Sequence, residues 1–254
     1  MGIFSNLALD IIGSVIAAVI GWMFSKWIKN RIVNRKILHE QNRLLIAIGY
    51  EFYKEGLTKF HFSRDDYGRT LSSYLDTATT SISIVSISLG LTNKEGRFTD
   101  LFRKKLAQND HFVIAVSLIN PNNPSLIKVV ADTLDIQPDK LHNEITEMLK
   151  DLLDCHQHLT TAERSRFKIL VHDCFPMGSV IMLDATPTSG TIQIETKLYK
   201  TARNDSFGFQ LTRESSFFER NYTAWSRVIA DSKKIERKDL SRQRNRKLEK
   251  GGKK

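Results

Sequence analysis

The sequence is poor in cysteine and proline. It has two cysteines, Cys155 and Cys174, and five prolines among 254 residues. Two cysteines make no disulfide framework of the kind that holds small secreted domains together, and their spacing matches no common zinc site. Hydrophobic residues make up 41% and charged residues 26%, which are ordinary values for a globular protein. The composition therefore indicates a reduced compartment and a packed core.

Excess positive charge is missing from most of the chain. The net charge is +10, but residues 233–254 hold eleven Lys and Arg against three Asp and Glu. This basic tail includes Lys233, Lys234, Arg237, Lys238, Arg242, Arg244, Arg246 and Lys247. Three interpretations of the tail stay open: a solvated chain end, contact with the inner leaflet of a membrane, and binding of nucleic-acid phosphates. No aromatic residue interleaves these charges, so stacking on bases is not indicated.

One apolar run is long enough to cross a bilayer. Residues 7–28 are apolar except for Asp10, Ser14, Ser25 and Lys26, and about 20 residues span the hydrocarbon layer. A signal peptide and a buried core helix are the alternatives. Against a signal peptide, no Lys or Arg precedes the run and no small-residue cleavage site follows it. The basic residues from Lys26 to Lys36 predict an N-terminus outside and a cytoplasmic domain at a bacterial inner membrane.

One side of this predicted helix carries small residues. Asp10, Gly13, Ala17 and Gly21 are spaced three or four apart, which places them on a single face. Small residues four apart let two membrane helices approach closely, and an acidic residue in lipid usually faces a partner or water. We therefore expect the anchor to self-associate, although small residues are also common in membrane helices generally.

The rest of the chain predicts a helical stalk and an α/β domain. Apolar residues recur at helical spacing through residues 29–55, without a proline. From Gly56 onward, strand and helix patterns alternate, which predicts a mixed sheet flanked by helices. The expected strands are 59–62, 81–89, 111–119, 166–172, 179–185 and 191–200, and the expected helices are 65–79, 96–108, 125–134, 138–158 and 214–231, the last with Phe217, Phe218, Tyr222 and Trp225 on its inner side. Four parts follow: an anchor (1–28), a stalk (29–55), an α/β domain (56–232) and the basic tail (233–254).

A series of short motifs runs through the α/β domain. They are Phe62-Ser63-Arg64-Asp65-Asp66-Tyr67, the strand Ile82–Leu89, the strand ending Leu118-Ile119-Asn120-Pro121, and Leu183-Asp184 followed by Gly190–Glu195. With this series, residues 56–231 resemble the phospholipase D-like domain of bacterial proteins that keep the fold and lose the catalytic motif. The resemblance covers about two thirds of the chain and implies a phospholipase D-like mixed sheet.

The catalytic motif of that superfamily is missing. Active members carry His-x-Lys-x4-Asp and then Gly-Ser-x-Asn, in which the His attacks phosphorus and the Lys holds the phosphate oxygens. None of the seven histidines here has Lys two residues later. With the family's Asp aligned on Asp184, Met177 stands at the His position and Ser179 at the Lys position. Since methionine forms no phosphoenzyme and serine supplies no cation, this chemistry is expected to be absent, and other chemistry stays open.

Several residues are weaker candidates for a site. Arg64, Asp65 and Asp66 follow the first expected strand and suit either a ligand or a helix N-terminus. His172 and Cys174 are two apart at a strand end, so their side chains share a face; they suit either a nucleophile pair or, as the favoured interpretation, an ordinary structural strand end. The other catalytic candidates are Asp184 and Glu195, which we expect on facing strands, either as a carboxylate pair or as solvated strand ends. The His156-x-His158 pair does not have zinc-site spacing, so no metal and no cofactor are expected.

The organisation as a whole indicates a membrane effector. Small bacterial membrane proteins of this kind resemble antiphage-defence effectors of retron or nucleotide-signalling systems, which disrupt the membrane when a cytoplasmic domain is triggered. The expected partners are the bilayer, further copies of the chain, and nucleic acid or a nucleoprotein at the basic tail. Two alternatives stay open: a membrane-tethered phosphodiesterase or nuclease with a rearranged site, and a scaffold that binds nucleic acid through the tail.

Overall fold

The computed structural model describes residues 56–61, 70–89, 98–174, 178–196, 200 and 207–240. The chain divides into two compact units, Met1–Phe52 and Tyr53–Lys254, and every element given below belongs to the second. Within the described ranges, no helix combines the length and apolar character that a bilayer span requires. The expected anchor at 7–28, its packing face of Asp10, Gly13, Ala17 and Gly21, and the stalk at 29–55 lie outside the described residues.

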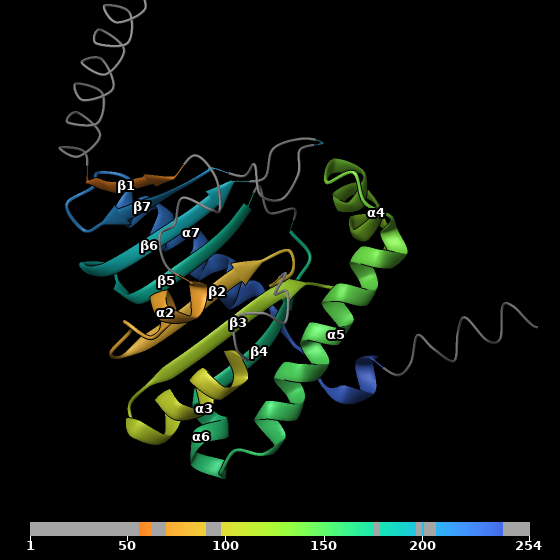
Figure 1. Cartoon of the computed structure of the whole chain (residues 1–254), viewed down its shortest axis with the longest axis horizontal. Helices are drawn as coiled ribbons and strands as arrows, with labels where there is room; N and C mark the ends of the chain where they lie inside the picture. The colour runs from red at the N-terminus through yellow and green to blue at the C-terminus, as the bar shows by residue number, and fades with distance from the viewer. Residues whose placement is uncertain are drawn as a thin grey trace, which may run out of the picture. The chain divides into compact units, whose positions relative to one another are not determined.

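A mixed sheet forms the centre of the domain (Figure 1). In the part of the chain that the structure describes, its strand order is β1-β7-β6-β5-β2-β3-β4-β8. Strands β2, β3 and β4 are parallel neighbours, and all other neighbouring pairs are antiparallel. The bounds are β1 Leu57–His61, β2 Ser81–Ser86, β3 Val113–Ile119, β4 Phe167–His172, β5 Gly178–Thr186, β6 Ser189–Thr196, β7 Gly208–Thr212 and β8 Lys233–Lys234.

Helices cover both faces of the sheet (Figure 1). Their bounds are α2 Leu71–Leu75, α3 Phe98–Gln108, α4 Pro124–Thr133, α5 Pro138–Gln157, α6 Thr161–Arg166 and α7 Phe218–Asp231. Helices α3 and α5 belong to the larger apolar cluster, with alternate residues of β2, β3, β4 and β5, on what we call the α3/α5 face. Helix α7 packs on the opposite α7 face, against alternate residues of β5 and β6. The fold is therefore a three-layered α/β arrangement.

Apolar spacing explains which side of each helix is buried. In α5 the buried residues Leu141, Ile145, Leu149 and Leu152 recur every three or four positions, which forms one stripe along the helix. On the other side of the sheet, α7 buries Phe218 fully, and Tyr222 and Trp225 pack beside it. Burying one such large apolar side chain contributes about 1.5–3 kcal/mol.

Helix starts follow local capping signals. The side chain of Asn123 accepts a hydrogen bond from the Leu126 N–H at 3.1 Å, with Pro124 as the first helical residue of α4. Thr160 and Glu163 form a reciprocal capping box at the start of α6. These short polar contacts satisfy N–H groups that the helices themselves leave without acceptors.

Most expected elements of the α/β domain are confirmed. The two helices expected at 125–134 and 138–158 occur at Pro124–Thr133 and Pro138–Gln157, and the apolar run at 111–119 contains strand β3, Val113–Ile119. The mixed character expected of the sheet is also present, since β5, β6 and β7, late in the chain, form an antiparallel portion. The sequence patterns missed β7, the short helix α6 and the edge strand β8.

Two expectations about helices were wrong. Residues 65–79 were expected to be one helix, but α2 ends at Leu75. The ammonium of Lys105 binds the carbonyl oxygens of Asp76 and Ala78, which holds this segment in a turn before β2. Phe217 was expected on the inner side of the last helix, but it precedes α7 and is 48% exposed.

The basic tail differs from the expectation at its start. Lys233 and Lys234 form β8, which pairs with β4, and the next residue, Ile235, is buried in the larger apolar cluster. Lys233 forms an ion pair with Asp173 at 3.3 Å. Two further basic residues also have acidic partners: Arg237 pairs with Asp154 at 3.2 Å and Lys238 with Glu236 at 2.7 Å. Arg242, Arg244, Arg246 and Lys247 lie outside the described residues.

Arg166 joins α6 to the end of α3. Its guanidinium donates to the carbonyl oxygens of Asn109 at 2.7 Å, Phe112 at 3.2 Å and Leu106 at 3.1 Å. Arg166→Ala removes these donors from partly buried carbonyl groups, so we expect the free energy of unfolding to fall by about 2–3 kcal/mol. Denaturant unfolding of the full chain measures this loss. Arg164→Ala, on the same helix but exposed, serves as the control and should leave the stability nearly unchanged.

Candidate functional site

Polar residues gather where the central strands end. Strands β2, β3 and β4 are parallel, so their carboxyl ends lie at one edge, and antiparallel β5 begins there. Ser86, the last residue of β2, is 2% exposed, and its hydroxyl lies 2.7 Å from the hydroxyl of Ser179 on β5. The Ser86 hydroxyl also donates to the Ser88 carbonyl at 3.0 Å. We call this the strand-end site.

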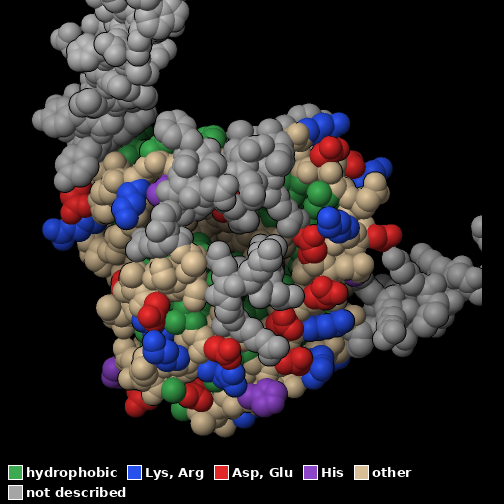
Figure 2. Space-filling view, in the orientation of Figure 1, with side chains coloured by type: hydrophobic (Ala, Val, Ile, Leu, Met, Phe, Trp, Pro, Cys, Tyr) green, Lys and Arg blue, Asp and Glu red, His purple; other side chains and the backbone are tan. Residues whose placement is uncertain are grey.

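Buried polar side chains continue along the antiparallel strands. Glu195 pairs in register with Ser179, and Gln193 pairs with Gln210 of β7. Each of these three, Glu195, Gln193 and Gln210, is 8% exposed. By alternation they share the α3/α5 face with Ser179. Figure 2 views the domain from this face and shows its surface hollowed near the middle.

His172 and Cys174 meet at the same edge of the sheet, as their spacing suggested. The Cys174 sulfur lies 3.2 Å from Nδ1 of His172, and Nε2 of His172 lies 3.3 Å from the main-chain oxygen of Ser86. The Cys174 carbonyl oxygen is also 3.2 Å from Nδ1. A neutral imidazole has one N–H group. With its proton on Nε2, the ring donates to the Ser86 carbonyl and accepts from the Cys174 thiol at Nδ1; with its proton on Nδ1, it donates to the Cys174 carbonyl instead.

Burial keeps both partners of this pair neutral. His172 is 4% exposed, and burial lowers its pKa even though the Ser86 and Cys174 carbonyls favour the charged ring. Although Cys174 is exposed overall, partial burial of its sulfur raises the pKa of the thiol, and the nearby Asp173 carboxylate raises it further. The resting state at neutral pH is therefore a thiol beside an imidazole, without a preformed thiolate.

The Asp173 carboxylate lies between the segment that follows β3 and the first residue of the basic tail. Its Oδ1 accepts hydrogen bonds from the side-chain amides of Asn120 at 2.9 Å and Asn123 at 3.2 Å. Its Oδ2 accepts from Lys233 at 3.3 Å. Burial raises the pKa of Asp173, but these three donors outweigh it and hold the pKa below its usual value. The first basic residue of the expected tail is thus part of the border of the strand-end site.

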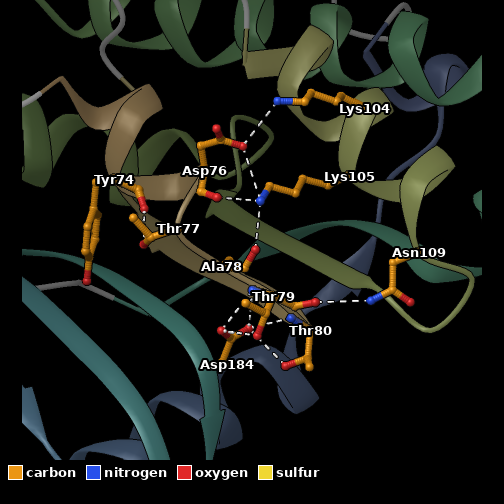
Figure 3. Close-up of polar contacts among 10 residues, drawn as sticks. All are labelled: Tyr74, Asp76, Thr77, Ala78, Thr79, Thr80, Lys104, Lys105, Asn109 and Asp184. Carbon is orange, nitrogen blue, oxygen red and sulfur yellow. Dashed lines mark hydrogen bonds and ion pairs between the residues drawn. The ribbon is translucent and has the colours of Figure 1, made fainter.

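Asp184 lies at the opposite end of β2 and has a structural role (Figure 3). Its Oδ1 accepts from the main-chain N–H groups of Thr79 at 3.0 Å, Thr80 at 2.7 Å and Ser81 at 2.9 Å. The hydroxyls of Thr79 and Thr80 donate to the same carboxylate, each at 2.9 Å. Successive N–H groups of this kind form a concave site for an anion. The carboxylate of Asp184 fills it.

The backbone around Asp184 is built for this contact. Asp184 has a φ of 51°, and the pairing of β5 with β6 shifts between Leu183 and Thr186. Gly190, across the turn, has a φ of 92°, and a Cβ there would lie 2.5 Å from the Asp184 carbonyl oxygen. A bulge of this kind redirects a side chain out of the regular alternation.

Asp184 and Glu195 do not form the expected carboxylate pair. In the register of β5 and β6, Leu183 pairs with Thr191, whereas Glu195 pairs with Ser179. Asp184 lies five residues further along β5 than Ser179, the partner of Glu195, which is about 16 Å. With its oxygens already bonded to Thr79, Thr80 and Ser81, Asp184 is also not available as a base.

Other expected site residues are placed elsewhere or lie outside the described part. Arg64, Asp65 and Asp66 lie outside the described residues. The ring of His156 faces the Arg164 carbonyl at 3.3 Å, and that of His158 faces the Asp154 carbonyl at 2.6 Å. Among the described residues, no group of three or more His, Cys, Asp or Glu side chains is placed to hold a metal ion.

Comparisons with known proteins give little. No family model matches the chain, and no curated protein matches it. Among solved structures, TrmBL2, an archaeal chromatin protein with a novel mode of DNA binding, is similar at 11% identity and a TM-score of 0.39, over 86% of this chain and 71% of that chain. At that score the likeness carries no argument about this chain.

Removing the charge of Asp184 should destabilise the domain. Asp184→Asn keeps the size of the side chain but turns one acceptor oxygen into a donor that faces N–H groups. Because charge-assisted hydrogen bonds are lost and buried donors are left unsatisfied, we expect the free energy of unfolding to fall by about 2–4 kcal/mol. Denaturant unfolding checks this, with Asp110→Asn as the matched control, since that carboxylate is exposed.

The hydrogen bonds to the Asp184 carboxylate also make the free energy of unfolding depend on pH. Partial burial raises the pKa of Asp184, but the hydrogen bonds from Ser81, Thr80 and Thr79 outweigh it and keep the pKa below its usual value. A lowered native pKa stabilises the fold fully above the unfolded value of about 3.9, and this stabilisation is lost as pH falls through the native pKa. Unfolding measured from about pH 6 to about pH 3 should therefore lose more stability in the native chain than in Asp184→Asn. Equal losses would contradict the assignment.

Proposed function

We propose that this chain is a membrane-anchored, non-enzymatic effector of bacterial antiphage defence, with a phospholipase D-like cytoplasmic domain. The observation that carries the non-enzymatic part is the pairing of Ser179 with Ser86 at 2.7 Å. Ser179 is the residue that the resemblance aligns with the phosphate-binding lysine. A hydroxyl bonded to a second hydroxyl offers no cation to a phosphodiester.

The fate of Asp184 supports the same proposal. The resemblance aligns this residue with the aspartate of the catalytic motif, and here it bonds to Thr79, Thr80 and Ser81. Ser179 lies beside Ser86 and Glu195, and neither side chain supplies the imidazole nucleophile or the cation that the superfamily mechanism uses. A folded sheet with these substitutions is suited to binding and to transmitting a conformational change.

The membrane part of the proposal rests on the sequence. The apolar run at 7–28 is followed by basic residues, and its face of Gly13, Ala17 and Gly21 suits close helix packing. In this proposal the cytoplasmic domain is triggered, the anchors of several copies assemble, and the assembly makes the inner membrane permeable.

Anchoring has a direct test. Full-length protein should sediment with bacterial membranes and stay there through washes with concentrated salt and alkaline carbonate, because about 20 apolar residues insert rather than adhere. A chain without residues 1–28 should appear in the supernatant. Recovery of the full-length protein in the supernatant, free of lipid, would remove the anchor and the effector proposal together.

Assembly through the anchor has a separate test. Strong overexpression of the full chain, which favours assembly by mass action even without the trigger, should depolarise the cells, as followed with a potential-sensitive dye. The triple change Gly13→Ile, Ala17→Ile, Gly21→Ile should abolish depolarisation without loss of membrane attachment. The control is Val15→Ile with Val19→Ile, which adds bulk to the opposite side of the predicted helix. Cells that stay polarised with the unaltered chain, while purified protein hydrolyses phosphodiesters, would favour the enzyme alternative.

A second candidate function, a nucleic-acid tether, finds less support. Lys233, Arg237 and Lys238 have acidic partners within the domain. Their charges are therefore partly neutralised before any phosphate arrives. Binding of nucleic acid through the tail has to come mainly from the basic residues after Leu240.

A further inference from the structure

Cys174, His172 and Ser86 together have the geometry of an activated nucleophile. A reactive thiol needs a base within hydrogen-bond reach and a third group that orients the base. The Cys174 sulfur is 3.2 Å from Nδ1 of His172, and the Ser86 carbonyl 3.3 Å from Nε2 fixes the ring. The ring is almost fully buried, whereas Cys174 is exposed. The base is therefore held in place and the nucleophile faces solvent.

The second cysteine shows what such a thiol looks like without a base. Cys155 is buried on α5, its sulfur faces the Thr99 carbonyl at 3.5 Å, and burial raises its pKa to about 11. Among the described residues, no histidine ring is in contact with the Cys155 sulfur to accept its proton. The chain thus holds an inert buried thiol and an exposed thiol paired with a base, which makes Cys155 an internal reference.

We propose that Cys174 is a thiolation site, at which His172 promotes exchange with a low-molecular-weight disulfide. The S–H proton of Cys174 moves to Nδ1 of His172 as the sulfur attacks one sulfur of the disulfide. A bond forms between the Cys174 sulfur and that sulfur, the original S–S bond breaks, and the leaving thiolate takes the proton back from Nδ1. The products are a mixed disulfide on Cys174 and one free thiol, so no other oxidant or reductant takes part.

The pair of Cys174 and His172 is better suited to reaction with a disulfide than with an electrophile whose leaving group needs no proton. A free thiol leaving group is a weak acid, so its departure is helped by the proton that His172 has just received. The charged groups around the pair are also defined: Asp173 acts on both His172 and Cys174, and its carboxylate is paired with Lys233. Among the described residues around the pair, no Lys or Arg side chain without an acidic partner is placed to stabilise a resting thiolate.

The pH dependence of the reaction separates this mechanism from ordinary thiol reactivity. Purified full-length protein is incubated with oxidised glutathione, and the adduct on each cysteine is followed by mass spectrometry of peptides. With His172 as base, the rate at Cys174 should change little from about pH 6.5 to about pH 8, because the imidazole stays neutral. An unassisted thiol gains about tenfold per pH unit over that range, as its thiolate fraction does.

Variants distinguish the effect of His172 as a base from the effect of solvent exposure on the reactivity of Cys174. In His172→Gln, the side-chain amide can still donate to the Ser86 carbonyl but accepts no proton, so the rate at Cys174 near pH 7 should fall by about tenfold or more and regain the steep pH dependence. Cys174→Ser should carry no adduct at position 174, and Cys155 should react slowly in both proteins. Protein unfolded in denaturant supplies the unassisted rate for both cysteines.

Two results would overturn the proposal. One is a tenfold rise per pH unit at Cys174 in the unaltered folded chain. The other is a reaction at Cys174 no faster than at Cys155. If His172→Gln fails to fold, the profile of the unaltered protein decides by itself. Neither result bears on membrane attachment or depolarisation, so this proposal and the proposed function can fail separately.

Discussion

The carboxylate of Asp184 fixes the alignment of the two halves of the sheet. Strand β2 is where the parallel half meets the antiparallel half, and Asp184 of β5 binds the N–H groups that lead into β2. A slip of one residue between β2 and β5 would move every side chain to the opposite face. The register that Asp184 holds pairs Val85 with Val180, and so brings Ser86 beside Ser179. The hydrogen bonds to one carboxylate at the start of β2 therefore help to set which side chains meet at the other end.

Apolar periodicity correctly predicted the helices and strands whose apolar patterns are long. The stripe of α5 and the continuous run of β3 are each long enough to exclude other interpretations, and both occur nearly at the expected bounds. Strand β7 was missed although Phe209 and Leu211 alternate with polar residues, because five residues are too few to stand out. Helix α2 is shorter than expected, since its end depends on Lys105, a residue almost thirty positions away. Such a tertiary contact leaves no local pattern.

The candidate site was predictable only where sequence spacing determines geometry. His172 and Cys174 are two residues apart at the end of a strand, and this alone brings them to one side. The partnership of Ser86 with Ser179 depends on strand order, which the pattern of elements does not give. Asp184 and Glu195 were expected together because both lie on the hairpin of β5 and β6, but the register places them at opposite ends of it. That two residues lie on paired strands constrains the distance between their side chains less than a spacing of two positions on one strand does.

The two ends of β2 handle charge in different ways, and the difference follows from the donors available. At the start of the strand, successive N–H groups converge on one point, so a carboxylate there stays ionised and rigid. At the other end, burial of His172 outweighs the two carbonyl oxygens that favour its charged ring, and partial burial of Cys174 opposes ionisation of its thiol, so neither an imidazolium nor a thiolate is favoured at rest. Within the pair of Cys174 and His172, charge appears only while a proton moves between them, and the ion pair of Asp173 with Lys233 lies beside it. A neutral pair of this kind is stable in a folded core and becomes polar only when an electrophile arrives, which lets the same sheet be a firm scaffold and carry a reactive edge.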